Sequence, residues 1–366
     1  MEQSETYTER QKMGVLALST VVLGVIVGLS SVVLSLFLDV IEHFFLGFEE
    51  NTLVPVAIHA AGTQRLLSVT IGGIIAAGLW FIVQTKMKPT VGINKALEGE
   101  TMPLGASILH AVTQVFYVAT GGSVGRELAP REMGALLAQR WEMLLAKWHL
   151  DTLTADDRRL LIAAAAGAGF AGIYIAPITG MLFAVEILHK NVSKRSVSVS
   201  LGMSLIAMLV GASIKGFHPY YFVADRHFDL KMLPFVIVVG PIMGIAGAYF
   251  RKVFQWAGGK AKAKQVQVLW QLPLAALATG IVAYFFPQIM GNGRGLAELA
   301  INNESTKLIG MLAIGMILKA VITVFTLKAG AYGGTLAPSI GIGGSFGAIL
   351  GFAYVMMMPG ASIDQA

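Results

Sequence analysis

The sequence predicts an all-α polytopic membrane protein. Of its 366 residues, 55% are hydrophobic and only 13% are charged, whereas soluble domains carry about 25% charged residues. The apolar residues also form repeated runs of about 20, which is the length that crosses a bilayer as a helix. A chain of this size has room for roughly ten spanning or half-spanning helices. Its 42 glycines suit closely packed membrane helices and helices that are interrupted at a site.

Composition and motifs argue against several other classes of protein. The chain has no cysteine, so disulfides, a thiol nucleophile and a cysteine-ligated metal are excluded. The net charge of +6 is dispersed between apolar segments and indicates membrane topology, not nucleic-acid binding. Neither a phosphate-binding loop nor a hydrolase or zinc-protease motif is found. We therefore expect no cofactor, no metal and no enzyme. An intramembrane enzyme is the alternative class.

The first half of the chain predicts one long span followed by shorter elements. A polar segment, residues 1–12, precedes the first apolar run, Met13 to Leu38. The next elements expected are a span over 66–83, a half-helix over 90–99, a span over 104–119, a helix over 126–148, a tightly packed Ala/Gly-rich helix over 160–171, and a short span over 173–188. Thr154 to Asp157 is typical of a helix start.

The second half predicts five further spans, over 196–214, 233–254, 268–286, 308–327 and 336–358. The loops at 189–195 and 251–264 are basic, and basic loops stay in the cytoplasm. We therefore expect a plasma-membrane protein with a cytoplasmic N-terminus.

Two Gly-rich breaks interrupt the helical pattern. The first runs from Thr120 to Pro130 and the second from Lys328 to Pro338, and both end in Leu-Ala-Pro. Paired discontinuous helices are typical of ion transporters built from inverted repeats. We therefore expect a first membrane repeat over 13–190 and a second over 191–366, with broken half-helices that meet in mid-membrane.

Helix N-termini within the bilayer predict an anion site, because they present N–H groups and the positive end of the helix dipole. The candidate anion-binding residues lie at three such starts: Lys88; Arg126, Glu127 and Leu128; Gly334, Thr335 and Leu336. Lys319 is a further cation near the second break, which either attracts anions or snorkels to an interface.

Glu127 is the most informative ionisable residue, since a carboxylate at membrane depth is a functional-site hypothesis by default. It can occupy an anion site, or become protonated and leave it, which predicts both a gate and a proton carrier. The alternative is a structural ion pair with Arg126 or Arg131. Glu186 is a candidate inner proton group or an interfacial structural carboxylate. His110, on an apolar helix, is interpreted as a packing or hydrogen-bonded residue.

These motifs resemble those of the CLC family of chloride channels and proton-coupled anion antiporters. Gly125 to Pro130 is similar to the family's Gly-Arg/Lys-Glu-Gly-x-Pro signature, and Gly334 to Pro338 to its Gly-x-Phe-x-Pro signature. The resemblance implies a homodimer with one pore per subunit and Glu127 as the gating glutamate. It also implies that the backbone N–H groups of Thr335 and Leu336 bind the central anion, and those of Arg126 to Leu128 the outer one.

Three departures from the family pattern bear on mechanism. Lys88, or a near neighbour, stands where the family's anion-coordinating serine is expected, and altered residues there occur in the fluoride–proton antiporter branch. Ile187 follows Glu186 where a second glutamate usually carries protons. The family's C-terminal helices, with an anion-binding tyrosine, are expected after the final span and are not found.

The resemblance thus implies transport of a small monovalent anion, chloride or fluoride, with protons as the coupled ion. The expectation is an antiporter gated by Glu127. The alternatives are a passive gated chloride channel and a non-functional fragment.

Overall fold

The protein is described by a computed structural model covering residues 8–51, 53–150, 152–223, 230–259, 261–302 and 305–357. Within these ranges the chain is helical, and its β structure is limited to one isolated bridge. Seven of the described helices are long and apolar enough to cross a membrane, and two shorter apolar helices accompany them. This confirms the prediction of an all-α polytopic protein.

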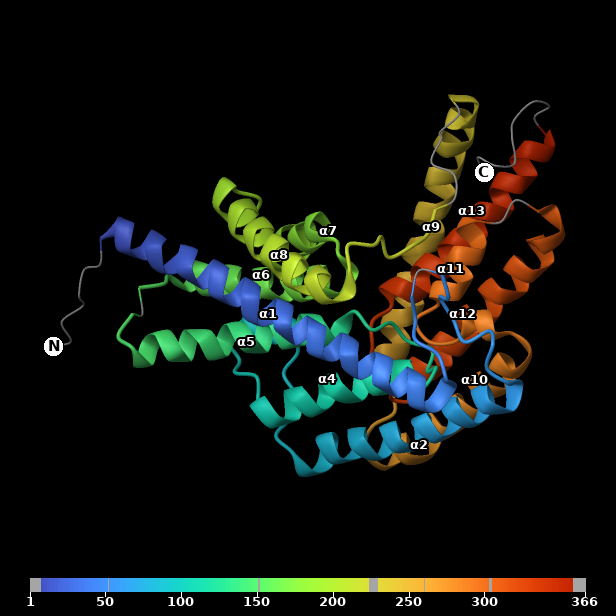
Figure 1. The fold of residues 1–366 in the computed structure, drawn as a ribbon, viewed down its shortest axis with the longest axis horizontal. Coiled ribbons are helices and arrows are strands. Elements are labelled where there is room, and N and C mark those ends of the chain that lie inside the picture. The colour runs from blue at the N-terminus through green and yellow to red at the C-terminus, as the bar shows by residue number, and fades with distance from the viewer. Residues whose placement is uncertain are drawn as a thin grey trace. The chain divides into compact units, whose positions relative to one another are not determined.

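The helices follow the order expected from the sequence (Figure 1). They are α1 (Glu9–Leu46), α2 (Gly62–Lys86), α3 (Ile93–Leu97), α4 (Leu104–Ala119), α5 (Leu128–Lys147), α6 (Ala155–Tyr174), α7 (Pro177–Leu182), the π-helix η1 (Phe183–His189), α8 (Lys194–Lys215), α9 (Leu233–Gly258), α10 (Val268–Phe285), α11 (Arg294–Ile301), α12 (Ile309–Lys328) and α13 (Leu336–Met357). Met358, the predicted end of the last helix, lies outside the described residues.

The described residues form two compact units that alternate along the chain. The first unit draws on Met1–Leu36, Met87–Val112 and Glu127–Tyr220, and the second on Phe37–Lys86, Thr113–Arg126 and Tyr221–Ala366. Helices α1 and α4 each contribute residues to both units. The division into repeats over 13–190 and 191–366 stays a prediction.

In the first unit, α6 packs against α5 on one side and α8 on another (Figure 1). Glycines permit this close approach: a Cβ added at Gly134 of α5 would lie 2.1 Å from the carbonyl oxygen of Ala165, and one at Gly169 would lie 2.1 Å from that of Pro130. Small residues at helix contacts are the usual means of packing membrane helices. The predicted tight packing of the Ala/Gly-rich segment is confirmed.

Local capping signals set the boundaries of α6. Thr154 accepts a hydrogen bond from the N–H of Asp157, whose carboxylate accepts one from the N–H of Thr154, which forms a capping box. This confirms the predicted helix start. The helix ends at Tyr174, and Pro177 begins α7. The short span predicted over 173–188 is confirmed in most of its length as the shorter apolar helix Pro177–His189, formed by α7 and the π-helix η1 without a break, whereas its first residues belong to the end of α6.

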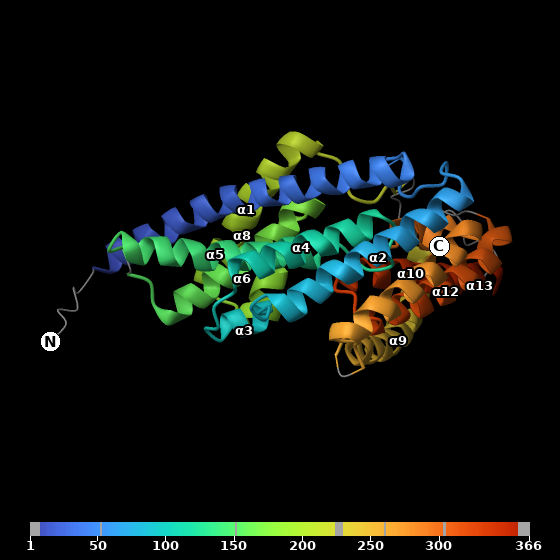
Figure 2. The same cartoon turned by 90° about the horizontal axis from the view of Figure 1, so that it is seen from below.

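In the second unit, α2 and α10 lie side by side, as both views show (Figures 1 and 2). The buried Arg65 of α2 joins them, because its guanidinium donates to the carbonyl oxygens of Ala283 and Tyr284 at 2.9 Å each. Helices α11, α12 and α13 form the rest of this unit together with α9. This unit contains the whole second Gly-rich break and the first break as far as Arg126.

Candidate functional site

The two Gly-rich breaks pair with one another in the second unit. The N–H of Gly125 donates to the carbonyl oxygen of Gly334, and the N–H of Gly334 donates to that of Gly125, both at 2.7 Å. These two bonds form the isolated antiparallel bridge of the described chain. Segments separated by about 200 positions are therefore fixed backbone to backbone, as the repeated motif led us to expect.

Glycine is required at several positions of this pairing. Gly121 has a φ of +101° and Gly330 a φ of +108°, a region that side-chain-bearing residues rarely adopt. A Cβ added at Gly333 would lie 2.6 Å from the Cγ2 atom of Val124 in the opposite break. The Gly-rich composition of the breaks thus follows from turn geometry and from close backbone approach.

A helix begins directly after each break. Helix α5 starts at Leu128, with Glu127 as its N-cap residue, and α13 starts at Leu336, directly after Thr335. The first N–H groups of a helix have no intrahelical acceptor, and the helix dipole makes this end electropositive. Glu127 is fully buried, at 0% exposed. Of the predicted anion-binding residues, Gly334 is buried, Thr335 is half-buried and the side chain of Leu336 is exposed.

The two arginines near Glu127 have other partners. The Nη2 atom of Arg126 lies 3.2 Å from Oε1 of Glu50. Arg131 donates from Nε to the backbone oxygen of Glu127 at 2.7 Å, and its guanidinium lies over the ring of Phe183 at 4.8 Å. Arg131 therefore fixes the backbone at the start of α5.

A buried network around Glu50 secures the first break to the start of α11. Glu50 accepts hydrogen bonds from Arg294 and Asn292, each at 3.1 Å, in addition to its pairing with Arg126. Arg294 also donates to Glu298 at 2.8 Å. Burial raises the pKa of Glu298 above its ordinary value, although Arg294 opposes the shift. This network was not predicted from the sequence; the i,i+4 spacing of Arg294 and Glu298 is the one local signal of it.

Lys319 of α12 is completely buried and does not reach an interface. Its ammonium donates to the hydroxyl of Ser123 and to the carbonyl oxygen of Ile289 at 2.9 Å, and to that of Gly291 at 2.7 Å. Of the two interpretations given to this residue, snorkelling is wrong. Lys319 places a positive charge beside the first break.

Lys88 and Glu186 occupy exposed positions in the first unit. Lys88 lies in the loop between α2 and α3. The half-helix predicted over 90–99 is shorter, at Ile93–Leu97, because Gly92 is its extended N-cap residue. Glu186 lies in the π-helix η1. No described contact tests the anion or proton roles assigned to these two residues, and both stay predictions.

His110 is buried, and its Nε2 atom lies 3.7 Å from Oε2 of Glu132 on α5. The interpretation of His110 as a partnered residue of an apolar helix is confirmed. The partner was not predicted, since Glu132 belongs to the next helix.

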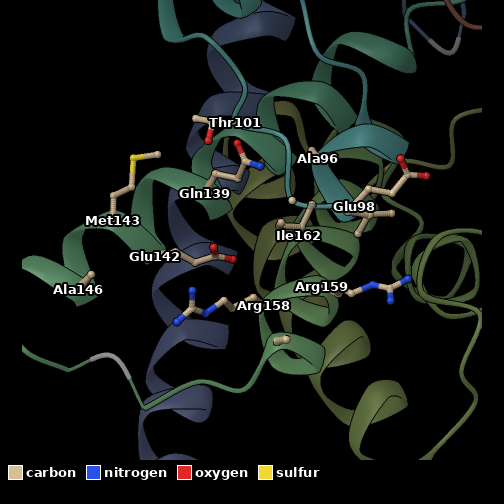
Figure 3. A pocket seen from close by; sticks show the side chains of 13 residues that line it. Ala96, Glu98, Thr101, Gln139, Glu142, Met143, Ala146, Arg158, Arg159 and Ile162 are labelled. Carbon is tan, nitrogen blue, oxygen red and sulfur yellow. The ribbon is translucent and has the colours of Figure 1, made fainter. Parts of the chain in front are cut away.

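The first unit also has an open cavity of about 400 Å³ between α3, α5 and α6 (Figure 3). Two arginines and two glutamates line it, namely Glu98, Glu142, Arg158 and Arg159. Figure 3 shows Glu142 and Arg158 next to one another on facing helices. The two positive and two negative side chains balance one another, so the lining of this cavity favours neither anions nor cations.

Known proteins resemble the chain over most of its length. The voltage-gated ClC-type chloride channel ClcB of Citrobacter koseri is 25% identical over 329 residues, covering 88% of this chain and 77% of the relative. The ClcB of Salmonella typhimurium is 24% identical over 347 residues, covering 93% and 81%.

Two solved structures share the fold. A slow cyanobacterial Cl⁻/H⁺ antiporter has a TM-score of 0.75 at 20% identity, covering 97% of this chain and 82% of that chain. A CLC-type fluoride/proton antiporter has a TM-score of 0.67 at 21% identity, covering 98% and 85%. The family model described as voltage gated chloride channel matches residues 72–366, which is well over half of the chain. The protein therefore belongs to the CLC family of voltage gated chloride channels and is a multi-pass membrane protein of anion transport.

Proposed function

We propose that this protein exchanges a small monovalent anion for protons, with Glu127 as both the gate and the proton carrier. The observation that carries the proposal is the backbone pairing of Gly125 with Gly334 at 2.7 Å. It fixes the segments from which two helices start, and one of these helices has a fully buried carboxylate at its N-cap.

In this mechanism the anion binds at the N–H groups that follow the breaks, at Leu336 and Thr335 and at Arg126 to Leu128. Such groups attract negative charge without requiring a full positive charge. The Glu127 carboxylate is itself an anion and competes for that position. When it takes up a proton it loses its charge and leaves, and the transported anion enters. Each exchange of carboxylate for anion thereby moves one proton.

The buried charge of Lys319 supports anion binding near the first break. Its ammonium is fixed by Ser123 and two backbone carbonyls, so little reorganisation is needed when an anion approaches. Lys319 is therefore assigned an electrostatic role: it raises the occupancy of an anion beside Ser123 of the first break.

For the substrate we favour fluoride over chloride. The reason is that Lys88, or a near neighbour, stands where the family's anion-coordinating serine is expected. The structural relatives leave both anions open, since one is a Cl⁻/H⁺ antiporter and another is a fluoride/proton antiporter. Glu186 is a second carboxylate that could exchange protons at one end of the route.

A passive chloride channel is the second candidate function. It is favoured by the names of the curated relatives, which are chloride channels, and by Ile187 beside the exposed Glu186. In a channel, Glu127 opens and closes the route without carrying a proton across.

We further propose a homodimer in the plasma membrane, with the N-terminus in the cytoplasm and one transport route per subunit. The basic loops at 189–195 and 251–264 support this orientation. Accessibility of single engineered cysteines in those loops to an impermeant reagent tests it, because the chain has no cysteine of its own.

The experiment that tests the function is flux from proteoliposomes, read with an anion electrode and a pH electrode together. The expected result is faster efflux of fluoride than of chloride, with protons moving in the opposite direction. Efflux of chloride with no proton movement would refute the antiport function and support the chloride channel.

A further inference from the structure

His110 and Glu132 form a buried histidine–carboxylate contact between two consecutive helices of the first unit. His110 lies on α4 and Glu132 in the second turn of α5. Their side chains are 5% and 12% exposed, and Nε2 of His110 lies 3.7 Å from Oε2 of Glu132. The two groups therefore face one another in an environment that largely excludes water.

Such a pair is unusual for a membrane interior. Ionisable side chains are costly there, and those that are retained mark ion pathways and proton relays. Histidine changes its charge closest to neutral pH of all side chains, and a nearby carboxylate stabilises its protonated form. A histidine–carboxylate pair can thus hold one exchangeable proton under physiological conditions.

The position of the pair along the chain connects it to the gate. Helix α4 leads into the first break, and α5 leads out of it with Glu127 as its N-cap residue. Glu132 lies five residues beyond Glu127, which corresponds to a rise of about 7.5 Å along a helix axis. The proton of the pair is therefore held close to the start of α5.

The other acids and bases of α4, α5 and α6 can be placed along these three helices. Glu127 and Arg131 precede Glu132 at the start of α5, and Arg131 is bound to the backbone of Glu127. Tyr174 ends α6, and the charged groups of α5 and α6 that remain lie toward the opposite end: Arg140, Glu142, Lys147, Asp156, Asp157, Arg158 and Arg159. Helix α4 carries no further acid or base apart from Tyr117.

We propose that His110 and Glu132 form a second proton-binding site, which takes protons from water and passes them to the Glu127 carboxylate during exchange. The inference rests on the proposed antiport function and adds the group that supplies the proton. In the resting pair His110 is protonated and Glu132 is ionised. Delivery of one proton to Glu127 leaves a neutral imidazole beside the Glu132 carboxylate, and a proton from water restores the pair.

The test compares Glu132→Gln and His110→Asn with the unchanged protein in proteoliposomes, with anion and proton fluxes recorded together. Glu132→Gln keeps the shape of the side chain and removes the negative charge that stabilises the protonated imidazole of His110. We expect the proton flux per anion to fall by roughly tenfold or more, whereas anion efflux continues at a similar rate. Glu142→Gln is the matched control on the same helix, and its coupling ratio should not change.

Two readouts separate a proton role from a structural one. Glu132→Asp retains a carboxylate and should restore most of the coupling, and the pH dependence of the proton flux should flatten in His110→Asn. If either Glu132→Gln or His110→Asn folds and exchanges protons at the unchanged ratio, the relay is refuted and the antiport function stands. If the unchanged protein moves anions without protons, the antiport function fails and the relay fails with it.

Discussion

The first and second Gly-rich breaks have similar backbones and different chemistry. Each contains a glycine with a φ above +100° and each precedes a helix, and they bind one another through Gly125 and Gly334. The first carries the buried Glu127 and is secured by Glu50 and Lys319. The second has Thr335 at the corresponding place, and its flanking Lys328 is exposed.

Under the proposed function, the backbone of the two breaks provides the anion site and the side chains of one break control it. A symmetrical pair of breaks with neutral residues would bind an anion equally from both sides. A single carboxylate in one of them makes occupancy depend on protonation.

Glu127→Gln removes the chemical difference between the breaks and should have the largest effect. The amide cannot carry a proton and does not compete as an anion, so proton flux should fall by about a hundredfold or more while anion flux persists. Simultaneous anion and pH electrodes measure both. Proton coupling that survives in this variant would refute the role assigned to Glu127.

Lys319→Met should disturb the first break and leave the second intact. It leaves the hydroxyl of Ser123 and the carbonyl oxygens of Ile289 and Gly291 without their donor, and each buried polar group left unsatisfied costs about 1–3 kcal/mol. A marked fall in the thermal unfolding temperature and weaker anion binding by calorimetry are expected. Lys328→Met is the matched control, and equal losses in the two variants would contradict the asymmetry.

Gly121→Ala and Gly330→Ala test the backbone geometry that the breaks share. Each places a side chain at a positive φ, which costs roughly 1–3 kcal/mol, so both should destabilise the protein by similar amounts. Gly347→Ala, in the interior of α13 with open space around it, should be neutral or stabilising by up to about 1 kcal/mol. Denaturant unfolding in detergent compares the three variants, and a neutral Gly121→Ala would argue against the geometry.

The smallest expected effect concerns Glu298, at the far end of the network that secures the first break. Its raised pKa means that the folded protein holds this proton more tightly than the unfolded chain. Its contribution to stability is therefore full below the ordinary value of 4.5 and is lost as the pH rises through the folded pKa. Glu298→Gln should remove this pH dependence from thermal unfolding curves. If the slope of the unfolding temperature against pH is the same in Glu298→Gln as in the unchanged protein, burial does not raise the pKa of Glu298.

The sequence predicted the helical membrane fold because apolar runs of spanning length have few alternatives in a bilayer. It also predicted the pairing of the breaks, since two copies of one motif suggested equivalent places in the fold. Contacts between side chains distant in sequence could not be predicted. The partners of Lys319, Arg126 and His110 depend on which helix faces lie together, and apolar runs without a polar face do not specify this.

Helix boundaries were predicted where a local signal exists and missed where it does not. The start of α6 follows from the capping box of Thr154 and Asp157. The division of the next stretch into α7 and a π-helix has no comparable signal apart from Pro177. Lys88 was proposed from its place before a predicted half-helix and Glu186 from its place at the end of a predicted span, and both side chains are exposed.

The measurement that most directly tests proton-coupled exchange through Glu127 is proton pumping driven by an anion gradient. Proteoliposomes loaded with fluoride, and then others loaded with chloride, are diluted into a solution free of both anions at equal pH inside and outside. Efflux of the anion should drive protons inward against the gradient that builds up, and Glu127→Gln should stop the protons while the anion still leaves. Anion efflux from the unchanged protein with no proton uptake would contradict the exchange mechanism.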